Sequence, residues 1–229
     1  MSAVRKIARC AIVLAVSMRC ASVATAATDL IDLRRIDTVS GDAVAGKTKA
    51  TVCMACHGPV GIAPVPMFPN LAGQKAEYLY WALVEFQRAA RPDSPMTAQV
   101  AKLSDADMHD LSAYFATLAP AGAEAGSAPK EARGAELFLH GDPARGVPPC
   151  QGCHGADAGG HPLAADAARY RAYPALRGQH APYIAQRLKD YRDGKLTESS
   201  NDRIMRGVAH ALDDDSIEQI ASWLQAGAR

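Results

Sequence analysis

The sequence lacks a long hydrophobic run and a large surplus of basic residues. The apolar run near its N-terminus, Cys10–Met18, is too short to span a bilayer. Across the 229 residues, 25 Lys and Arg are matched by 24 Asp and Glu, and no basic patch of the kind that neutralises phosphates is present. These absences argue against a membrane span at this position and against nucleic acid as a partner.

Residues 1–26 have the order of a secretory signal peptide. Basic residues come first, the apolar run follows, and small residues surround Ala24-Thr25-Ala26. A buried first helix is the alternative, but Arg9 and Arg19 flank the run and fit it poorly. Cleavage after Ala26 would remove four basic residues and no acidic one, leaving 21 basic and 24 acidic residues in the exported chain.

In the exported chain, cysteine occurs only in two short motifs. Cys10 and Cys20 lie in the signal, and the other four cysteines belong to TVCMACHG at 51–58 and PCQGCHG at 149–155. Paired cysteines in an exported protein ordinarily indicate disulfides. The histidine directly behind each pair indicates a different use.

Cys-x-x-Cys-His is the pattern of covalent haem attachment. Two thiols one helical turn apart can reach two vinyl groups on a haem edge, and the following histidine then points at the iron. A bound haem would also supply the apolar core that two short helical units lack. The motifs therefore predict two haem c groups. Cys53 and Cys56 are predicted to attach the first haem covalently, with His57 as an iron ligand. Cys150, Cys153 and His154 are predicted to do the same for the second haem.

Two other readings of the motifs fit less well. A zinc site would place its cysteine pairs about 15–20 residues apart, whereas 93 residues separate Cys56 from Cys150. A thiol–disulfide motif favours a βαβ context and does not need the histidine.

The chain contains an internal repeat. FPNLAGQ at 68–74 recurs as YPALRGQ at 173–179 with a spacing of 105 residues, and LSDADM at 103–108 aligns with LDDDSI at 212–217. Between the halves lies APAGAEAGSAPK, a composition typical of linkers. We therefore expect a signal peptide at 1–26, a first domain at 27–120, a linker at 121–129 and a second domain at 130–229.

Each half has helical patterns and no convincing strand, which predicts an all-α fold. Apolar residues recur at three- and four-residue spacing in Ala76–Arg88 and Pro182–Arg192. The last helix of each half follows a capping residue, Ser104 or Asp213. Further helices are expected at Asp42–Cys56 and Glu131–Gly141.

The sixth iron ligands are sought among the methionines. After Cys150 the chain has a single methionine, Met205, and Met96 occupies the matching position in the first half. The remaining candidates have weaker claims: Met67 pairs with an alanine, Met108 lies on an apolar helix face, and Met54 sits inside the motif. Met96 and Met205 are therefore the predicted axial partners.

The other histidines are expected to face solvent. These are His109, His140, His161, His180 and His210. His109 aligns with Glu218 and His180 with Lys75, which indicates polar, outward positions. Pro69 and Pro174, at matching places in the repeat, offer carbonyls that could accept from the axial histidines.

These motifs resemble those of class I cytochromes c, and specifically the two-haem cytochrome c4 family. The resemblance rests on CMACH, CQGCH, FPNLAGQ, YPALRGQH, SPM and IMRGV, and covers nearly the whole exported chain. It implies two similar domains packed face to face, with thioether links at the four motif cysteines and the axial pairs His57/Met96 and His154/Met205. Two departures are Lys75 in place of a histidine and a long loop at 155–173.

The resemblance also implies an exported bacterial electron carrier, often loosely attached to the inner membrane. A methionine-ligated iron has no open position for a substrate, so no catalytic residue is expected. We expect a periplasmic carrier of the respiratory chain, with redox proteins as transient partners. The alternatives are the cytochrome subunit of a dehydrogenase that oxidises, for example, sulfide or an alcohol, and a two-haem enzyme. Two-haem thiosulfate-oxidising enzymes use a thiolate ligand, for which no cysteine remains.

A substitution tests the assignment of Met205. Met205→His should retain the haem and sharply lower the reduction potential of one of the two haems, because replacing thioether by imidazole favours ferric iron. A redox titration followed in the visible spectrum measures this. An unchanged titration would remove Met205 from the ligand set.

Overall fold

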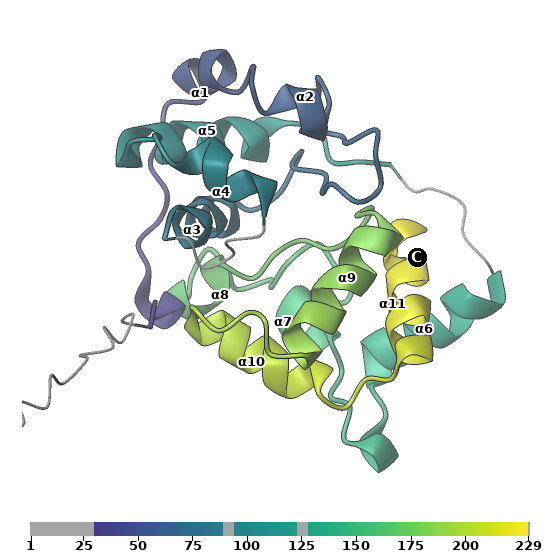
Figure 1. Cartoon of the computed structure of the whole chain (residues 1–229). Helices are drawn as coiled ribbons and strands as arrows, with labels where there is room; N and C mark the ends of the chain where they lie inside the picture. Colours follow the sequence, from purple (N-terminus) through teal and green to yellow (C-terminus); the bar gives the residue numbers. More distant parts are fainter. Residues whose placement is uncertain (1–29, 89–93, 123–127, 229) are drawn as a thin grey trace, which may run out of the picture.

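The computed structural model describes residues 30–88, 94–122 and 128–228, and these residues are helical with no β-strand. The proposed signal peptide lies outside them, as does most of the predicted linker. Two halves are visible in Figure 1, with the N-terminal half above the C-terminal half. No helix in the described part of the chain is long and apolar enough to cross a membrane. The predicted all-α fold is confirmed.

The two halves have a similar order of helices, except that the second has one additional short helix, α8. The first contains α1 Ala43–Lys49, α2 Met54–His57, α3 Ala76–Gln87, α4 Pro95–Val100 and α5 Asp105–Thr117. The second contains α6 Ala128–His140, α7 Gln151–His154, α8 Ala168–Arg171, α9 Ala181–Arg192, α10 Ser200–Ala209 and α11 Asp214–Gln225. Short 3₁₀ turns lie at Leu33–Arg35 and Pro143–Arg145.

In each half the first and last helices cross at a glycine. Gly46 of α1 lies against α5, and a Cβ there would collide with the Asp110 carbonyl oxygen. Gly134 of α6 meets α11 in the same way at the Gln219 carbonyl. Only glycine allows backbones to approach this closely. Each crossing leads into a separate hydrophobic core, one around Leu111 and Phe115 and the other around Phe138 and Trp223.

The predicted caps of the last helices are confirmed. Ser104 and Asp107 form a reciprocal capping box at the start of α5, and the Asp213 side chain accepts from the Ser216 N–H at the start of α11. The expected continuous helix at Asp42–Cys56 is wrong. It ends at Lys49, because the chain turns through residues 50–53 with Ala50 fully buried, and a separate helical turn then carries the motif.

The crossing glycines give a stability prediction. Gly134→Ala should lower the free energy of unfolding by about 1–3 kcal/mol, because the added methyl group overpacks the α6–α11 contact. Thermal or urea unfolding of the haem-loaded protein measures it. Gly122→Ala is the control, since a Cβ at Gly122 meets nothing within 4 Å. Equal stability of the two variants would contradict the prediction.

Candidate haem-attachment sites

Each Cys-x-x-Cys-His motif forms one helical turn that ends at a glycine. The histidines, His57 and His154, are the last residues of α2 and α7. Gly58 and Gly155 follow with φ of 78° in both halves, a left-handed conformation that favours glycine. A Cβ at Gly58 would also collide with the Ile62 carbonyl oxygen. The glycine therefore allows the chain to turn sharply behind the histidine.

Both histidine rings are buried and held by a proline carbonyl. The Nδ1 atom of His57 lies 2.9 Å from the Pro69 oxygen, and that of His154 lies 3.0 Å from the Pro174 oxygen. Because a carbonyl only accepts, each Nδ1 carries the proton and each Nε2 keeps a free lone pair. Burial lowers the pKa of both rings below the usual range. Both histidines are thus neutral, which is the state that binds a metal.

No disulfide joins the four motif cysteines to one another. Burial raises the pKa of Cys53 and Cys153, and it raises the pKa of Cys150 to about 11. These cysteines therefore remain protonated, unlike the thiolates of zinc sites and redox-active pairs. In the described ranges, no group of three or more His, Cys, Asp and Glu side chains is placed to hold a metal ion.

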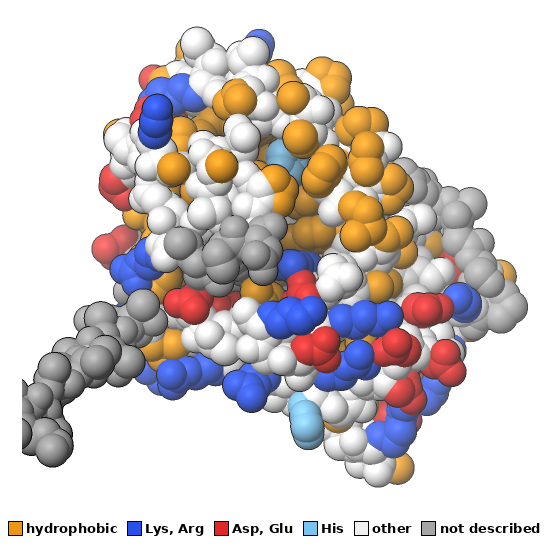
Figure 2. All heavy atoms as spheres, viewed as in Figure 1, with side chains coloured by type: hydrophobic (Ala, Val, Ile, Leu, Met, Phe, Trp, Pro, Cys, Tyr) orange, Lys and Arg blue, Asp and Glu red, His pale blue; other side chains and the backbone are white. Residues whose placement is uncertain are grey.

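Apolar side chains remain exposed around the motifs. Val60, Val65 and Met67 in the loop after the first motif are 58%, 46% and 54% exposed. In the second half, Leu163 and Ile204 are 50% and 41% exposed. Figure 2 shows hydrophobic side chains gathered over the N-terminal half on the face drawn. An apolar disc could cover such side chains. With the neutral histidines and protonated thiols, the residues present fit a covalently attached haem.

The structure places the two candidate methionines on short helices that the sequence did not predict. Met96 is in the first turn of α4 and Met205 is in α10, and both are half-buried. Met108 is 3% exposed, which confirms its predicted place in the core. Met67 lies in an exposed loop, and Met54 is the first residue of α2.

The prediction that the remaining histidines face solvent is wrong for His180. His180 is 4% exposed, and its Nε2 lies 2.9 Å from the Ala63 carbonyl in the other half, to which it donates. His140 and His210 are exposed, as expected. His109 is half-buried beside Tyr80, and His161 is half-buried in a stack with Tyr170. The alignment of His180 with Lys75 was misleading, because both positions face the contact between the halves.

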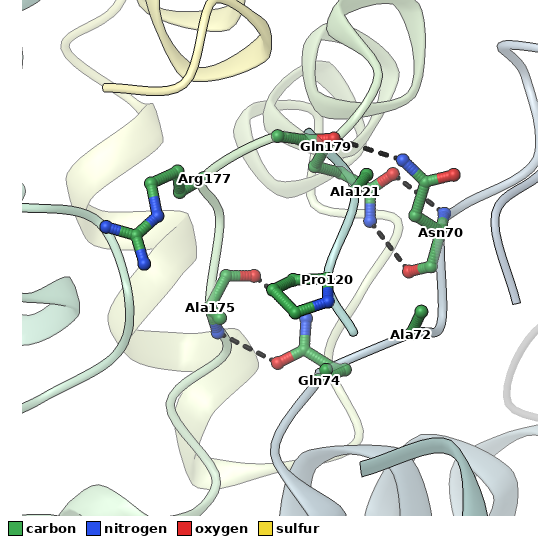
Figure 3. Close-up of a pocket in the computed structure, with 10 residues that line it drawn as sticks. Asn70, Ala72, Gln74, Pro120, Ala121, Ala175, Arg177 and Gln179 are labelled. Carbon is green, nitrogen blue, oxygen red and sulfur yellow. Dashed lines mark hydrogen bonds between the residues drawn. The ribbon is translucent and has the colours of Figure 1, made fainter. Parts of the chain in front are cut away.

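Two glutamines from the repeat join the halves reciprocally (Figure 3). Gln179 accepts from the Asn70 N–H at 2.9 Å and donates to the Asn70 carbonyl at 3.0 Å. Gln74 does the same with Ala175, with both distances at 2.8 Å. We call these four hydrogen bonds the glutamine clamp. The repeated Gly-Gln pair was visible in the sequence, but nothing there indicated that its side chains cross to the opposite half.

The glutamine clamp lies next to the proline carbonyls. Asn70 directly follows Pro69, so Gln179 holds the backbone next to the carbonyl that orients His57. Ala175 directly follows Pro174, so Gln74 does the same for the carbonyl that orients His154. Lys75 extends the same contact, since a Cβ at Gly160 would come within 2.5 Å of Lys75 Cε. Replacement of a histidine by Lys75 in the first half therefore preserves a contact between the halves.

Two motifs of this kind, each with a carbonyl-held neutral histidine, define a c-type cytochrome with two haem groups. The sequence model of the cytochrome c family matches residues 43–119 and again residues 131–228. Cytochrome c4 of Azotobacter vinelandii is 39% identical over 195 residues, covering 81% of this chain and 89% of the relative. The chain belongs to the cytochrome c family and, within it, to the cytochrome c4 proteins.

The comparisons extend to a solved structure and to a second group of relatives. Reduced recombinant cytochrome c4 from Pseudomonas stutzeri superposes with a TM-score of 0.72 at 37% identity, covering 82% of this chain and 99% of that one. A thiosulfate dehydrogenase electron acceptor of Thiomonas intermedia is 34% identical over 187 residues, covering 80% of this chain and 81% of the relative. The fold is two cytochrome c domains, and the chain is a two-haem electron-transfer cytochrome.

The glutamine clamp gives a prediction about cooperativity. Gln179→Leu should destabilise the contact between the halves by about 1–3 kcal/mol, because the buried Asn70 N–H and carbonyl lose their partners. In the haem-loaded protein, the two halves should then unfold in separate calorimetric transitions. Gln99→Leu, at an exposed glutamine on α4, is the control. A single unshifted transition in Gln179→Leu would show that the glutamine clamp does not join the halves energetically.

Proposed function

We propose that this protein is a periplasmic one-electron carrier whose two haems have the axial pairs His57/Met96 and His154/Met205. The observation that carries the proposal is the pair of buried, neutral histidines, each held at Nδ1 by a proline carbonyl directly behind a Cys-x-x-Cys motif. Bound haem supplies a one-electron couple between ferric and ferrous iron. The thioethers of Met96 and Met205, as iron ligands, would favour the ferrous state and would leave no place for a substrate at the iron.

The chain's own residues would keep the haem environment unchanged during electron transfer. Cys53, Cys56, Cys150 and Cys153 would attach the porphyrin edges. The carbonyls of Pro69 and Pro174 would hold each histidine ring in one tautomer and one orientation. Glutamine side chains from the opposite half hydrogen-bond to the backbones of Asn70 and Ala175, and this restrains the neighbouring proline carbonyls. A rigid site of this kind lowers the cost of reorganisation when an electron arrives or leaves.

The proposed partners are a quinol-oxidising complex or dehydrogenase as donor and a terminal oxidase or reductase as acceptor. The signal-like residues 1–26 support export to the periplasm, and loose association with the inner membrane belongs to the same proposal. A second candidate function is to accept electrons from one particular dehydrogenase. It is favoured by the likeness to a thiosulfate dehydrogenase electron acceptor, which suggests a sulfur-compound dehydrogenase as donor.

A redox-titrated visible spectrum tests the carrier proposal. The exported protein should contain two covalent low-spin haems per chain, with the ferric iron–thioether band present for both and both reduction potentials high. Met96→Ala and Met205→Ala should each remove about half of that band. A high-spin haem, or a band unaffected by either substitution, would contradict the ligand assignment.

Co-purification separates the two candidate donors. Stable association with one dehydrogenase from periplasmic extracts would favour the dedicated role. Recovery as a free protein that a purified quinol-oxidising complex reduces rapidly would favour the general carrier. Turnover with peroxide or thiosulfate as sole substrate would overturn the carrier proposal itself.

A further inference from the structure

A segment near the N-terminus crosses from the first half to the second. Residues 31–36, here the N-terminal strap, precede the first residue that matches the cytochrome c family, residue 43. The Ile31 N–H donates to the Glu198 carbonyl at 2.9 Å, and the Ser200 N–H donates to the Ile31 carbonyl at 2.8 Å. Figure 1 shows this segment beside α8 and α10, before the chain runs up to α1. The family pattern and the repeat do not predict this contact.

Side-chain hydrogen bonds attach the N-terminal strap at two further points. The Leu33 N–H donates to the buried Ser200 hydroxyl at 3.0 Å. At the other end, Arg171 of the second half donates from Nη1 to the Ile36 carbonyl at 2.9 Å. The N-terminal strap is therefore held along its length rather than at a single residue.

The apolar side chains of the N-terminal strap form a third core between the halves. Ile31, Leu33 and Ile36 are 6%, 3% and 6% exposed, and they cluster with Ala172 of the second half. Trp81 and Val84 of α3, in the first half, pack against the same cluster. Because the cluster takes side chains from both halves, the N-terminal strap fills the space between α3 and the α8–α10 region.

Three of the four hydrogen bonds described above join the N-terminal strap to residues 198–200, at the start of the helix that carries Met205. The N-terminal N–H groups of a helix have no partners within the helix and fray unless capped. In α10 the Ser199 side chain accepts from the Asp202 N–H, while Ile31 accepts from the Ser200 N–H. Part of this cap is thus supplied by the first half. The matching helix α4 begins differently, with the Ser94 side chain accepting from the Met96 N–H itself.

We infer that the N-terminal strap is a positioning element for Met205. It fixes the start of α10, so that the thioether stays at the iron of the second haem. The inference rests on the proposed function, in which Met205 is a sixth ligand. A thioether is a neutral ligand that exogenous imidazole can replace, and the rate of replacement depends on how often the supporting helix moves away. Leu33 and Ser200 act through α10 and are positioning residues.

The test measures how fast imidazole displaces methionine in the ferric, haem-loaded protein. Displacement is followed by loss of the iron–thioether band, with one kinetic phase expected for each haem. Leu33→Ala should speed one phase about tenfold and leave the other unchanged, because hydrogen bonds join the N-terminal strap to the start of α10, whereas its contact with the first half is apolar packing on α3. Leu30→Ala is the matched control, since Leu30 is 36% exposed and next to the N-terminal strap. Unchanged phases in Leu33→Ala would overturn the inference.

Two further variants, Ser200→Ala and Met205→Ala, distinguish the possible explanations of the result. Ser200→Ala removes only the hydroxyl that accepts from Leu33, so it should fold if Leu33→Ala does not, and it should speed the same phase. Faster hydrogen exchange in α10 with both phases unchanged would show a structural role only, which also overturns the inference. Met205→Ala identifies the affected phase. If Met205→Ala leaves both phases intact, the ligand assignment fails; if it removes one phase that Leu33→Ala and Ser200→Ala leave unaltered, only the inference fails.

Discussion

The structure depends on the hydrogen bond from each motif histidine to a proline carbonyl. That bond fixes the proton on Nδ1, leaves the Nε2 lone pair free and sets the direction of the ring. Burial acts in the same sense by keeping both rings neutral. The glycines behind the motifs and the glycines at the helix crossings serve this arrangement, because they let the backbone pack closely around the rings.

The hydrogen bonds between the halves are nearly symmetric, while the packing around them is not. Gln74 and Gln179 make equivalent pairs of hydrogen bonds to Ala175 and Asn70. At the next position the symmetry ends, since His180 donates to a carbonyl and Lys75 lies over a glycine. Duplication therefore supplied the shared contacts, and divergence of single residues made the two sides different. The N-terminal strap adds a contact with no counterpart in the other half.

The sequence predicted the local chemistry better than the long-range packing. The two motifs, the repeat, the all-α fold and the capped last helices follow from patterns within a few residues, and the structure and relatives confirm them. His180 shows the limit of such patterns. Its burial depends on Ala63, which lies 117 residues away and on another domain. The N-terminal strap was missed for the same reason, because its partners Glu198 and Ser200 lie far along the chain. Helix α4 was missed because it is short. Helix α10 is strongly amphipathic, so its pattern could have been found in the sequence.

The glutamine clamp also constrains how the two sites can influence each other. Any displacement of the peptide at Asn70 moves both the Pro69 carbonyl beside His57 and the side chain of Gln179 in the other half. The reverse path runs from Ala175 through Gln74. Coupling free energy between two sites is reciprocal: the free energy by which the first site affects the second equals that by which the second affects the first. The short covalent distance from clamp to carbonyl, one peptide in each half, makes these backbone segments a direct mechanical route between the sites. Two separate one-haem proteins would lack that route, which gives the fused, duplicated chain a physical advantage beyond carrying two haems.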